Sequence, residues 1–234
     1  MYIIANGGMK LRNQENTIES ILLTKNASYV DGVLVDIRLT LDNLLVVFKN
    51  NDISIDTLGK GFVSKMTYQD LRKVKFPSKI FRHYIPTLEE ILKKYNSNKI
   101  IVLNLHDALD KNEILVDEVV KLLKKYSQYN YYLETGSVDV LGYLFEKAND
   151  YKIGPRLSFP PVESNCHVNF CDTLHDVSNK FVNTYSNILV HTVNEYNDLV
   201  KFLECVDINK RKDLLIISDY PKRLTLGVNQ DNNL

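Results

Sequence analysis

Short, solidly apolar runs alternate with amphipathic segments along almost the whole chain, and this alternation limits the folds open to it. The runs KIIVLNL at 99–105, NILVHTV at 187–193 and LLIIS at 214–218 carry hydrophobic side chains at nearly every position. A strand has this composition when both of its faces are buried, as in a parallel sheet covered by helices. The sequence therefore predicts an α/β fold built on a buried parallel sheet.

Eight segments have the length and composition of strands, and each is separated from the next by a helical or polar stretch. The candidates are Tyr2–Asn6, Gly32–Leu39, Leu44–Phe48, Lys99–Leu105, Tyr129–Leu133, Lys152–Leu157, Asn187–Val193 and Asp213–Ser218. The stretch Phe159–Asp176 is the least regular part of the chain, and we interpret it as a long loop with a weak strand inside.

Helix starts can be located between several of these strands. Asn16 with Glu19, and Thr87 with Glu90, have the spacing of capping boxes, in which each side chain bonds to the backbone of the other residue. Asn194 is expected to cap the helix that follows it. Helices and strands thus alternate from one end of the chain to the other.

About eight strands alternating with helices over 234 residues predict a (β/α)₈ barrel, formed by a single domain at 1–234. The segment at about 50–84 is expected to be an insertion after the second strand. An open doubly wound sheet is the alternative, but it usually carries a glycine-rich dinucleotide fingerprint, which this sequence lacks.

Composition excludes some partners. The chain has 29 Lys and Arg against 29 Asp and Glu, and no basic stripe, so we expect no nucleic-acid partner. It has no apolar run near 18 residues, so we expect no membrane span. The three cysteines are Cys166, Cys171 and Cys205; they form no close CxxC pair and predict reduced thiols in a cytoplasmic protein.

Several sequence blocks occur in an order and at spacings typical of one protein family. They are Glu15–Thr17, Asp31–Asp36, Leu39–Asn43, Leu45–Phe48, Gly59–Ser64, Thr67–Leu71, Ile85–Glu90, His191–Asn194 and Ser218–Pro221. Through these blocks the chain resembles the glycerophosphodiester phosphodiesterase family over nearly its whole length. The resemblance also implies a TIM barrel.

The resemblance implies hydrolysis of glycerophosphodiesters to glycerol 3-phosphate and an alcohol, the reaction of a phosphoric diester hydrolase of lipid metabolism. In the family, carboxylates hold a divalent metal that polarises the phosphate, and two histidines act as general acid and base. These parts are needed because attack on a phosphodiester builds charge on the phosphate oxygens, and the leaving alkoxide must be protonated. Carboxylates suit hard cations such as Ca²⁺ or Mg²⁺.

The chain departs from the family pattern at the acid–base and metal positions. The two family histidines fall on Asn6 and Lys49, and two metal-binding glutamates fall on Leu34 and Asn104, which leaves Asp36 as the one matched metal ligand. Asparagine does not titrate near neutral pH, and leucine cannot bind a cation. Lysine starts from a pKa of about 10.4, so it would act as a base only after strong desolvation.

The positions that contact phosphate and substrate are changed as well. The family's arginines fall on Gly7 and Ile55, its phosphate-binding lysine on His106, and its tryptophan near the substrate on His191. The aspartate beside the second family histidine falls on Asn50. Much of the positive charge expected around a phosphate is therefore missing.

These departures favour a catalytically degenerate member of the family, a pseudoenzyme kept as a binding or regulatory barrel. One alternative is an active phosphodiester hydrolase with a shifted site built on Lys49, His106 and His191, because a fold does not fix its chemistry. Another is a subunit that acts through a protein interface.

We expect no confident catalytic residue and no metal, with Ca²⁺ or Mg²⁺ bound only if the site is active. A metal site rebuilt from Asp36, Asn104, His106 and Asp107 is the least favoured interpretation. We favour structural pairing of Asp36 with Lys49 or Arg38. A small-molecule ligand is expected at the carboxyl-end face of the barrel. The residues proposed to line that face are Asn6, Glu15, Asp36, Lys49, Asn104, His106 and His191.

Overall fold

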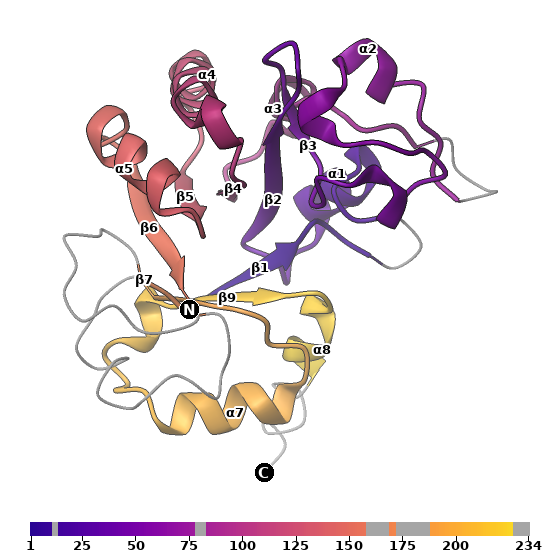
Figure 1. Ribbon diagram of the computed structural model, residues 1–234. Helices are drawn as coiled ribbons and strands as arrows, with labels where there is room; N and C mark the ends of the chain where they lie inside the picture. Colours follow the sequence, from indigo (N-terminus) through magenta and orange to yellow (C-terminus); the bar gives the residue numbers. More distant parts are fainter. Residues whose placement is uncertain (11–13, 78–82, 158–168, 172–187, 227–234) are drawn as a thin grey trace.

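The barrel consists of eight parallel strands that pair in a closed ring. A computed structural model describes residues 1–10, 14–77, 83–157, 169–171 and 188–226. The ring runs through β1 (Tyr2–Asn6), β2 (Gly32–Leu39), β4 (Ile100–Leu105), β5 (Tyr131–Thr135), β6 (Lys152–Leu157), β7 (Asn169–Cys171), β8 (Ile188–Val190) and β9 (Leu215–Ser218). Because β1 pairs in parallel with both β2 and β9, the ring is closed (Figure 1).

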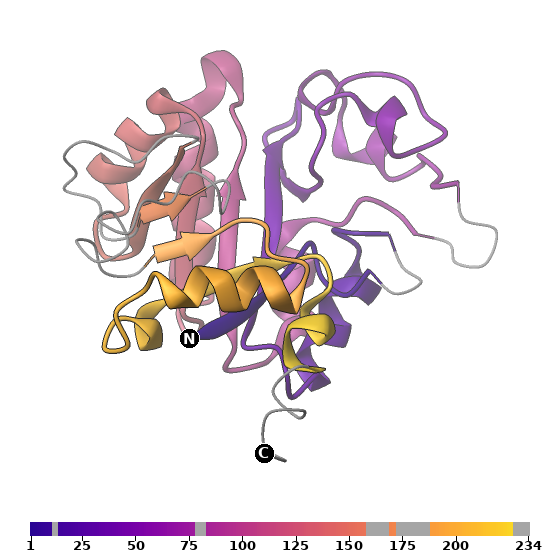
Figure 2. The ribbon, with the colours of Figure 1, turned by 90° about the horizontal axis from the view of Figure 1, so that it is seen from below.

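Helices cover the outside of this ring (Figures 1 and 2). They are α1 (Ile18–Asn26), α3 (Leu88–Tyr95), α4 (Asn112–Lys125), α5 (Val138–Lys147), α7 (Tyr196–Glu204) and α8 (Pro221–Leu226). The segment between β3 (Leu45–Val47) and α3 contains the 3₁₀ turns η1 (Ile53–Ile55) and η2 (Val63–Lys65) and the short α2 (Tyr68–Leu71). Two further 3₁₀ turns are η3 (Leu109–Lys111) and η5 (Arg211–Asp213). None of the helices in the described ranges is long and apolar enough to cross a bilayer.

Strands β1, β2, β4, β5, β8 and β9 contribute side chains both to a cluster inside the ring and to clusters outside it. Outward-facing residues such as Val35, Leu103 and Leu133 pack against α1, α3, α4 and α5. Inward-facing residues form a second cluster inside the ring, composed of Ile4, Leu34, Ile100, Val102, Tyr132, Leu189, Leu215 and Ile217. Alternate residues of a strand point to opposite faces. The strands are therefore buried on both sides, as the solid apolar runs predicted.

The closed ring confirms the predicted barrel and excludes the open doubly wound sheet. The strands at Tyr2–Asn6, Gly32–Leu39 and Lys152–Leu157 have the predicted bounds. The segment predicted as Leu44–Phe48 is β3, which lies outside the ring because it pairs antiparallel with β2 in a hairpin. The barrel's remaining strand is β7, the weak strand expected within Phe159–Asp176. The predicted strand Tyr129–Leu133 begins two residues late, at Tyr131.

One predicted capping box is confirmed and the other is displaced by one residue. Thr87 and Glu90 cap α3 reciprocally. At α1 the prediction of Asn16 with Glu19 is wrong, because Thr17 caps the helix together with Ser20. Asn16 instead adopts a left-handed backbone conformation, with φ at 58°, and its side chain points toward β2. Asn16 is thereby available for the mouth of the barrel.

The predicted cap of α7 is also wrong. Glu195 is the N-cap residue, and its side chain makes no capping hydrogen bond. The side chain of Asn194 bonds to Asp219 instead, accepting from its backbone N–H at 2.9 Å and donating to its carboxylate at 3.2 Å. Asn194 thus joins the segment after β8 to the segment after β9.

At the amino-end face of the barrel, one lysine holds the end of α1 and the loop that follows it. Lys99 Nζ donates to the carbonyl oxygens of Thr24, Ala27 and Val30 at 2.8, 2.6 and 2.6 Å. Carbonyl groups at a helix carboxyl end have no partner within the helix and carry partial negative charge. Burial lowers the pKa of Lys99, and the nearby charge of Asp31 opposes that shift.

Replacing Lys99 with methionine is predicted to lower the free energy of unfolding by about 2 kcal/mol, because hydrogen bonds to a charged group are lost and carbonyls are left without a donor. Lys125→Met is the matched control, since Lys125 is exposed and makes an ion pair with Glu89 at the surface. That variant is expected to unfold at nearly the same urea concentration as the wild type, because exposed ion pairs contribute little to stability. Urea unfolding measures both, and equal losses would contradict a special role for Lys99.

Candidate functional site

A layer of polar side chains lies directly above the apolar cluster inside the barrel. Two positions beyond the inward-facing Ile4, Leu34, Val102, Tyr132, Leu189 and Ile217 stand Asn6, Asp36, Asn104, Glu134, His191 and Asp219. Residues two apart on an extended strand share a face. These six residues therefore face the mouth at the carboxyl ends of the strands, where barrel enzymes assemble their active sites.

Asp36 is the centre of one hydrogen-bonded cluster at this mouth. Its Oδ2 accepts from Asn16 Nδ2 at 2.8 Å, and its Oδ1 accepts from Asn104 Nδ2 at 2.8 Å. His106 Nε2 lies 2.8 Å from the same Oδ1. Asn16 Oδ1 also accepts from the backbone N–H of Asp36 at 3.1 Å, which fixes the relative positions of the two residues. The carboxylate is thus enclosed by three donors.

These contacts lower the pKa of Asp36. Burial alone would raise it, because Asp36 is only 3% exposed. The hydrogen bond and the electrostatic interaction with His106, together with the hydrogen bonds from Asn16 and Asn104, outweigh burial and bring the pKa of Asp36 to about 2. Asp36 is therefore ionised throughout the physiological range.

A second carboxylate–imidazole pair spans the mouth. His191, which follows β8, places Nε2 3.0 Å from Oε2 of Glu134 on β5. Both side chains are buried, at 1% and 0% exposure. Arg156 on β6 makes an ion pair with Glu134, its Nη1 lying 3.8 Å from Oε1.

Alternating charges connect the rim of the mouth. Lys10 forms ion pairs with both Glu15 and Asp219. Glu15 Oε1 also lies 3.9 Å from Lys49 Nζ, and Asp219 Oδ1 accepts from Asn6 Nδ2 at 3.0 Å. Burial alone would raise the pKa of Asp219. The hydrogen bond and charge of Lys10, together with hydrogen bonds from Asn194 and Asn6, outweigh burial, so the pKa lies below its ordinary value.

The seven residues proposed from sequence are therefore divided among three groups. Asp36, Asn104 and His106 form one, Asn6 and Glu15 with Lys49 belong to the charged rim, and His191 pairs with Glu134. Within the described ranges, no hydrogen bond or ion pair joins Lys49, His106 and His191 to one another.

The predicted pairing of Asp36 with Lys49 or Arg38 is wrong, since its hydrogen bonds come from Asn16, Asn104 and His106. Arg38 Nε donates to the backbone carbonyl of Lys49 instead. Burial lowers the pKa of Arg38. The nearby negative charges of Asp36 and Asp107 act in the opposite direction, so Arg38 and Asp36 interact electrostatically without a direct bond. Asp107 itself accepts from the backbone N–H of Leu109, in a local turn away from the mouth.

Four functional candidates were not found from the sequence: Lys10, Glu134, Arg156 and Asp219. Glu134 had a detectable signal, because it is a charged residue within the apolar strand YYLET and lies two positions beyond Tyr132. Lys10 reaches the rim through a loop whose course depends on tertiary contacts.

The loop between β1 and α1 has no room for larger side chains at its two glycines. Gly7 has a φ of +65°, and a Cβ atom there would lie 2.8 Å from the Cβ of Glu15. Gly8 has a φ of +91°, and its Cβ would lie 2.5 Å from the backbone of Ser20. Glycine avoids both the steric contact and the conformational cost of positive φ. In this conformation position 7 cannot carry an arginine.

The residues at Asp36 do not provide the donors that a hard divalent cation requires. Such a cation takes several carboxylate or carbonyl oxygens. Three donors around Asp36 take up most of the roughly four acceptor positions of its carboxylate, and the inward neighbour Leu34 is apolar. Over the part of the chain that the structure describes, no group of three or more His, Cys, Asp or Glu side chains could hold a metal ion.

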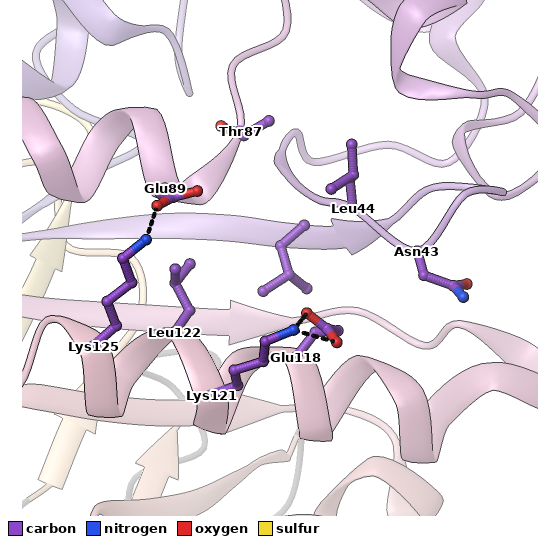
Figure 3. A pocket seen from close by; sticks show the side chains of 9 residues that line it. Asn43, Leu44, Thr87, Glu89, Glu118, Lys121, Leu122 and Lys125 are labelled. Atoms are coloured by element: carbon purple, nitrogen blue, oxygen red, sulfur yellow. Dashed lines mark hydrogen bonds and ion pairs between the residues drawn. The ribbon is translucent and has the colours of Figure 1, made fainter.

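A separate hollow lies on the outside of the barrel, between the β2–β3 hairpin, α3 and α4 (Figure 3). It has a volume of about 270 Å³. Leu44, Leu45 and Leu122 form its apolar part, and the ion pairs Lys125–Glu89 and Lys121–Glu118 lie at its edge. None of the seven residues proposed from sequence lines this hollow.

Comparison of the structure with solved structures confirms the fold. A phosphodiesterase from Oleispira antarctica, solved in complex with the product sn-glycerol-3-phosphate, superposes with a TM-score of 0.84 at 19% identity, covering 98% of this chain and 97% of the other. The glycerophosphodiester phosphodiesterase from Thermotoga maritima gives a TM-score of 0.74 at 18% identity, with 98% of each chain covered.

Sequence comparison links the chain to a family. YhdW of Bacillus subtilis is 32% identical over 131 residues, which is 54% of this chain and 53% of that protein. A glycerophosphodiester phosphodiesterase from Caldanaerobacter subterraneus is 27% identical over 130 residues, 53% of each chain. The matched region thus spans about half the length of these curated relatives. The sequence model of the glycerophosphoryl diester phosphodiesterase family matches residues 7–216. The chain belongs to the glycerophosphoryl diester phosphodiesterase family.

Proposed function

We propose that this family member does not hydrolyse phosphodiesters by the family's metal-dependent reaction, and that its barrel binds a small polar ligand at the mouth. The observation that carries the proposal is the state of Asp36. Both of its carboxylate oxygens accept hydrogen bonds from side chains of this chain. A carboxylate with these hydrogen bonds connects β2, β4 and the loop before α1, and its donors compete with a metal ion for its oxygen atoms.

Binding of a divalent cation at Asp36 would compete with the donors Asn16, Asn104 and His106 for the oxygen atoms of its carboxylate. Two of these residues are buried, and their amide groups would then need new partners. A cation would gain one carboxylate in exchange, since Leu34 and Asn104 supply no further charge. The hydrogen bonds that would be lost outweigh the single carboxylate that a cation would gain, which supports a mouth that functions without a divalent cation.

The acid–base chemistry of the family also lacks its parts. Asn6 donates a hydrogen bond to Asp219 and has no proton to cycle. The side chain of Lys49 is 48% exposed, so it is in contact with water, and the carboxylate of Glu15 beside it supplies a counter-charge. Neither residue has the buried environment that is typical of a catalytic acid–base group.

The charge of the mouth favours a ligand that is neutral or weakly charged. Each basic side chain described at the mouth lies close to a carboxylate. Lys10 pairs with Glu15 and Asp219, and Lys49 lies near Glu15. His106 contacts Asp36, and Arg156 lies near Glu134. A phosphate dianion binds well where positive groups exceed negative ones. Here the carboxylates of the mouth offset the cations, so a phosphate has no surplus of positive charge to meet.

One observation favours the second candidate, a hydrolase with a shifted site. His106 is 24% exposed and is held by the ionised Asp36, the arrangement in which a carboxylate orients an imidazole for proton transfer. A metal-free hydrolase of this kind would use His106 as its base. Lys49 and His191 bond to other partners, so His106 has no second acid–base group among its own contacts.

We predict that the protein does not hydrolyse glycerophosphocholine or bis(p-nitrophenyl) phosphate above background, with or without Ca²⁺, Mg²⁺ or Mn²⁺. A positioned acid–base group contributes roughly 10²–10⁴-fold to a rate, and both family positions lack one. Release of choline and of p-nitrophenol measures the two reactions. Turnover that needs a cation and disappears in Asp36→Asn would overturn the proposal. Cation-independent turnover lost in His106→Gln would establish the second candidate instead.

A pH prediction follows from Asp36. Its folded-state pKa of about 2 lies below the ordinary value of 3.8, so ionised Asp36 stabilises the fold at pH above 3.8 and this contribution is lost as pH falls toward 2. The shift corresponds to about 2 kcal/mol. Urea unfolding of the wild type and Asp36→Asn should differ by about this amount near pH 6, and the difference should shrink below about pH 3. A difference independent of pH would contradict the assignment.

A further inference from the structure

One face of α5 lines a groove on the outside of the barrel, next to the turn η3 that follows β4 (Figure 1). The residues of this face recur at helical spacing, at Val138, Asp139, Gly142, Tyr143 and Glu146. The opposite face of α5 is buried against the barrel through Val140 and Leu144. The groove, which we call the α5 groove, has a volume of about 510 Å³. It follows the helix for two turns, so its shape suits an elongated partner.

Apolar side chains are exposed on both walls of the α5 groove. Val138 on α5 is 80% exposed, and Leu109 on η3 is 64% exposed. A single exposed apolar side chain is normal on a protein surface, but two that line one groove form a patch that gains free energy when it is covered. The walls therefore favour a partner with apolar side chains of its own.

The floor of the α5 groove is open at a glycine in the middle of the helix. A Cβ atom at Gly142 would have no neighbour within 4 Å, so no contact in the described part of the chain requires a glycine there. Glycine is less favourable in a helix interior than every residue except proline. Its presence leaves the helix backbone accessible, so a partner could approach α5 closely at this point.

The charge of the α5 groove is negative. Asp110, Asp139 and Glu146 line it, and none of the three has an ion-pair partner among the residues that the structure describes. Lys147 at the end of α5 does not neutralise them, because it makes ion pairs with two carboxylates of α4. Within the described ranges no carboxylates converge closely enough to hold a metal ion. The three carboxylates are thus arranged for a partner that carries several positive charges.

We propose that the α5 groove is a docking site for a basic, amphipathic segment of a partner protein. Apolar side chains of the segment would cover Val138 and Leu109, and its lysines or arginines would face the three carboxylates. Nucleic acids and anionic membranes carry the same sign of charge as the groove and are disfavoured. This interaction is a function separate from ligand binding at the mouth, since none of the residues proposed there lines the groove.

The proposal is tested by NMR titration of uniformly ¹⁵N-labelled protein with three synthetic peptides. The first consists of alternating pairs of leucine and lysine. The second has glutamate in place of lysine, and the third has serine in place of leucine. The leucine–lysine peptide is expected to shift the amide resonance of Gly142 in a saturable way, and the other two are expected to leave it unchanged. Its affinity should fall as NaCl rises from about 0.05 to about 0.5 M, because salt screens exposed charges.

Variants locate the binding. Val138→Asp should weaken binding of the leucine–lysine peptide by about tenfold or more, the effect of losing a central apolar contact. Gly142→Gln should also weaken it, because the new side chain fills the groove, and should keep or raise the melting temperature, because glutamine favours a helix over glycine. Ile208→Asp is the matched control: Ile208 is 74% exposed, lies outside the groove, and should bind as the wild type does. Circular dichroism checks that each variant is folded.

Several results would overturn the proposal. One is binding that Val138→Asp leaves unchanged, and another is equal binding of the serine–lysine peptide, which would indicate general attraction to negative charge. A dimer that ultracentrifugation detects in the wild type and not in Val138→Asp would make a second copy of the chain the occupant. Sedimentation with phosphatidylcholine vesicles that depends on Val138 would make it a lipid surface. All of these results leave the function proposed for the mouth untouched, because hydrolysis assays test that function separately.

Discussion

The closure of the strand ring places a fixed constraint on everything at the mouth. Because β1 pairs with both β2 and β9, every strand has one face toward the interior and one toward the helices. Every second residue of a strand therefore points into the barrel. The apolar cluster around Leu34 and Tyr132 fills the lower part of the interior. The next inward positions then meet around a common axis, so their side chains must satisfy one another or a ligand. The polar layer follows from the barrel geometry as much as from selection for a reaction.

Within that layer the polar side chains form a dense set of hydrogen bonds and ion pairs. Asp36 keeps its charge because Asn16, Asn104 and His106 surround it. The rim uses alternating charge, from Lys49 through Glu15 and Lys10 to Asp219. The remaining unsatisfied atoms described in this layer belong to Glu134 and His191. The hydrogen bonds of the layer are therefore most numerous around Asp36, on the β2 side.

Sequence patterns predicted the barrel well because strand burial leaves a continuous apolar signature that does not depend on partners. They were weaker for β7, whose three residues lie in an irregular stretch, and for Leu44–Phe48, where a hairpin strand has the same composition as a barrel strand. Capping of α1 was misassigned because Asn16 and Thr17 are both good cap residues, and only the position of Asp36 decides which one turns inward. Site contacts between distant strands, such as His191 with Glu134, depend on the ring's register, which local patterns do not contain.

The glycine at position 7 couples the loop after β1 to the charged rim of the mouth. A side chain there would collide with Glu15, and Glu15 in turn holds Lys10 beside Asp219. A larger side chain at this position would therefore require Glu15 to move, and Glu15 could not move without disturbing its ion pair with Lys10. The course of the loop and the pairing of the rim charges are thus coupled through one position that has no side chain.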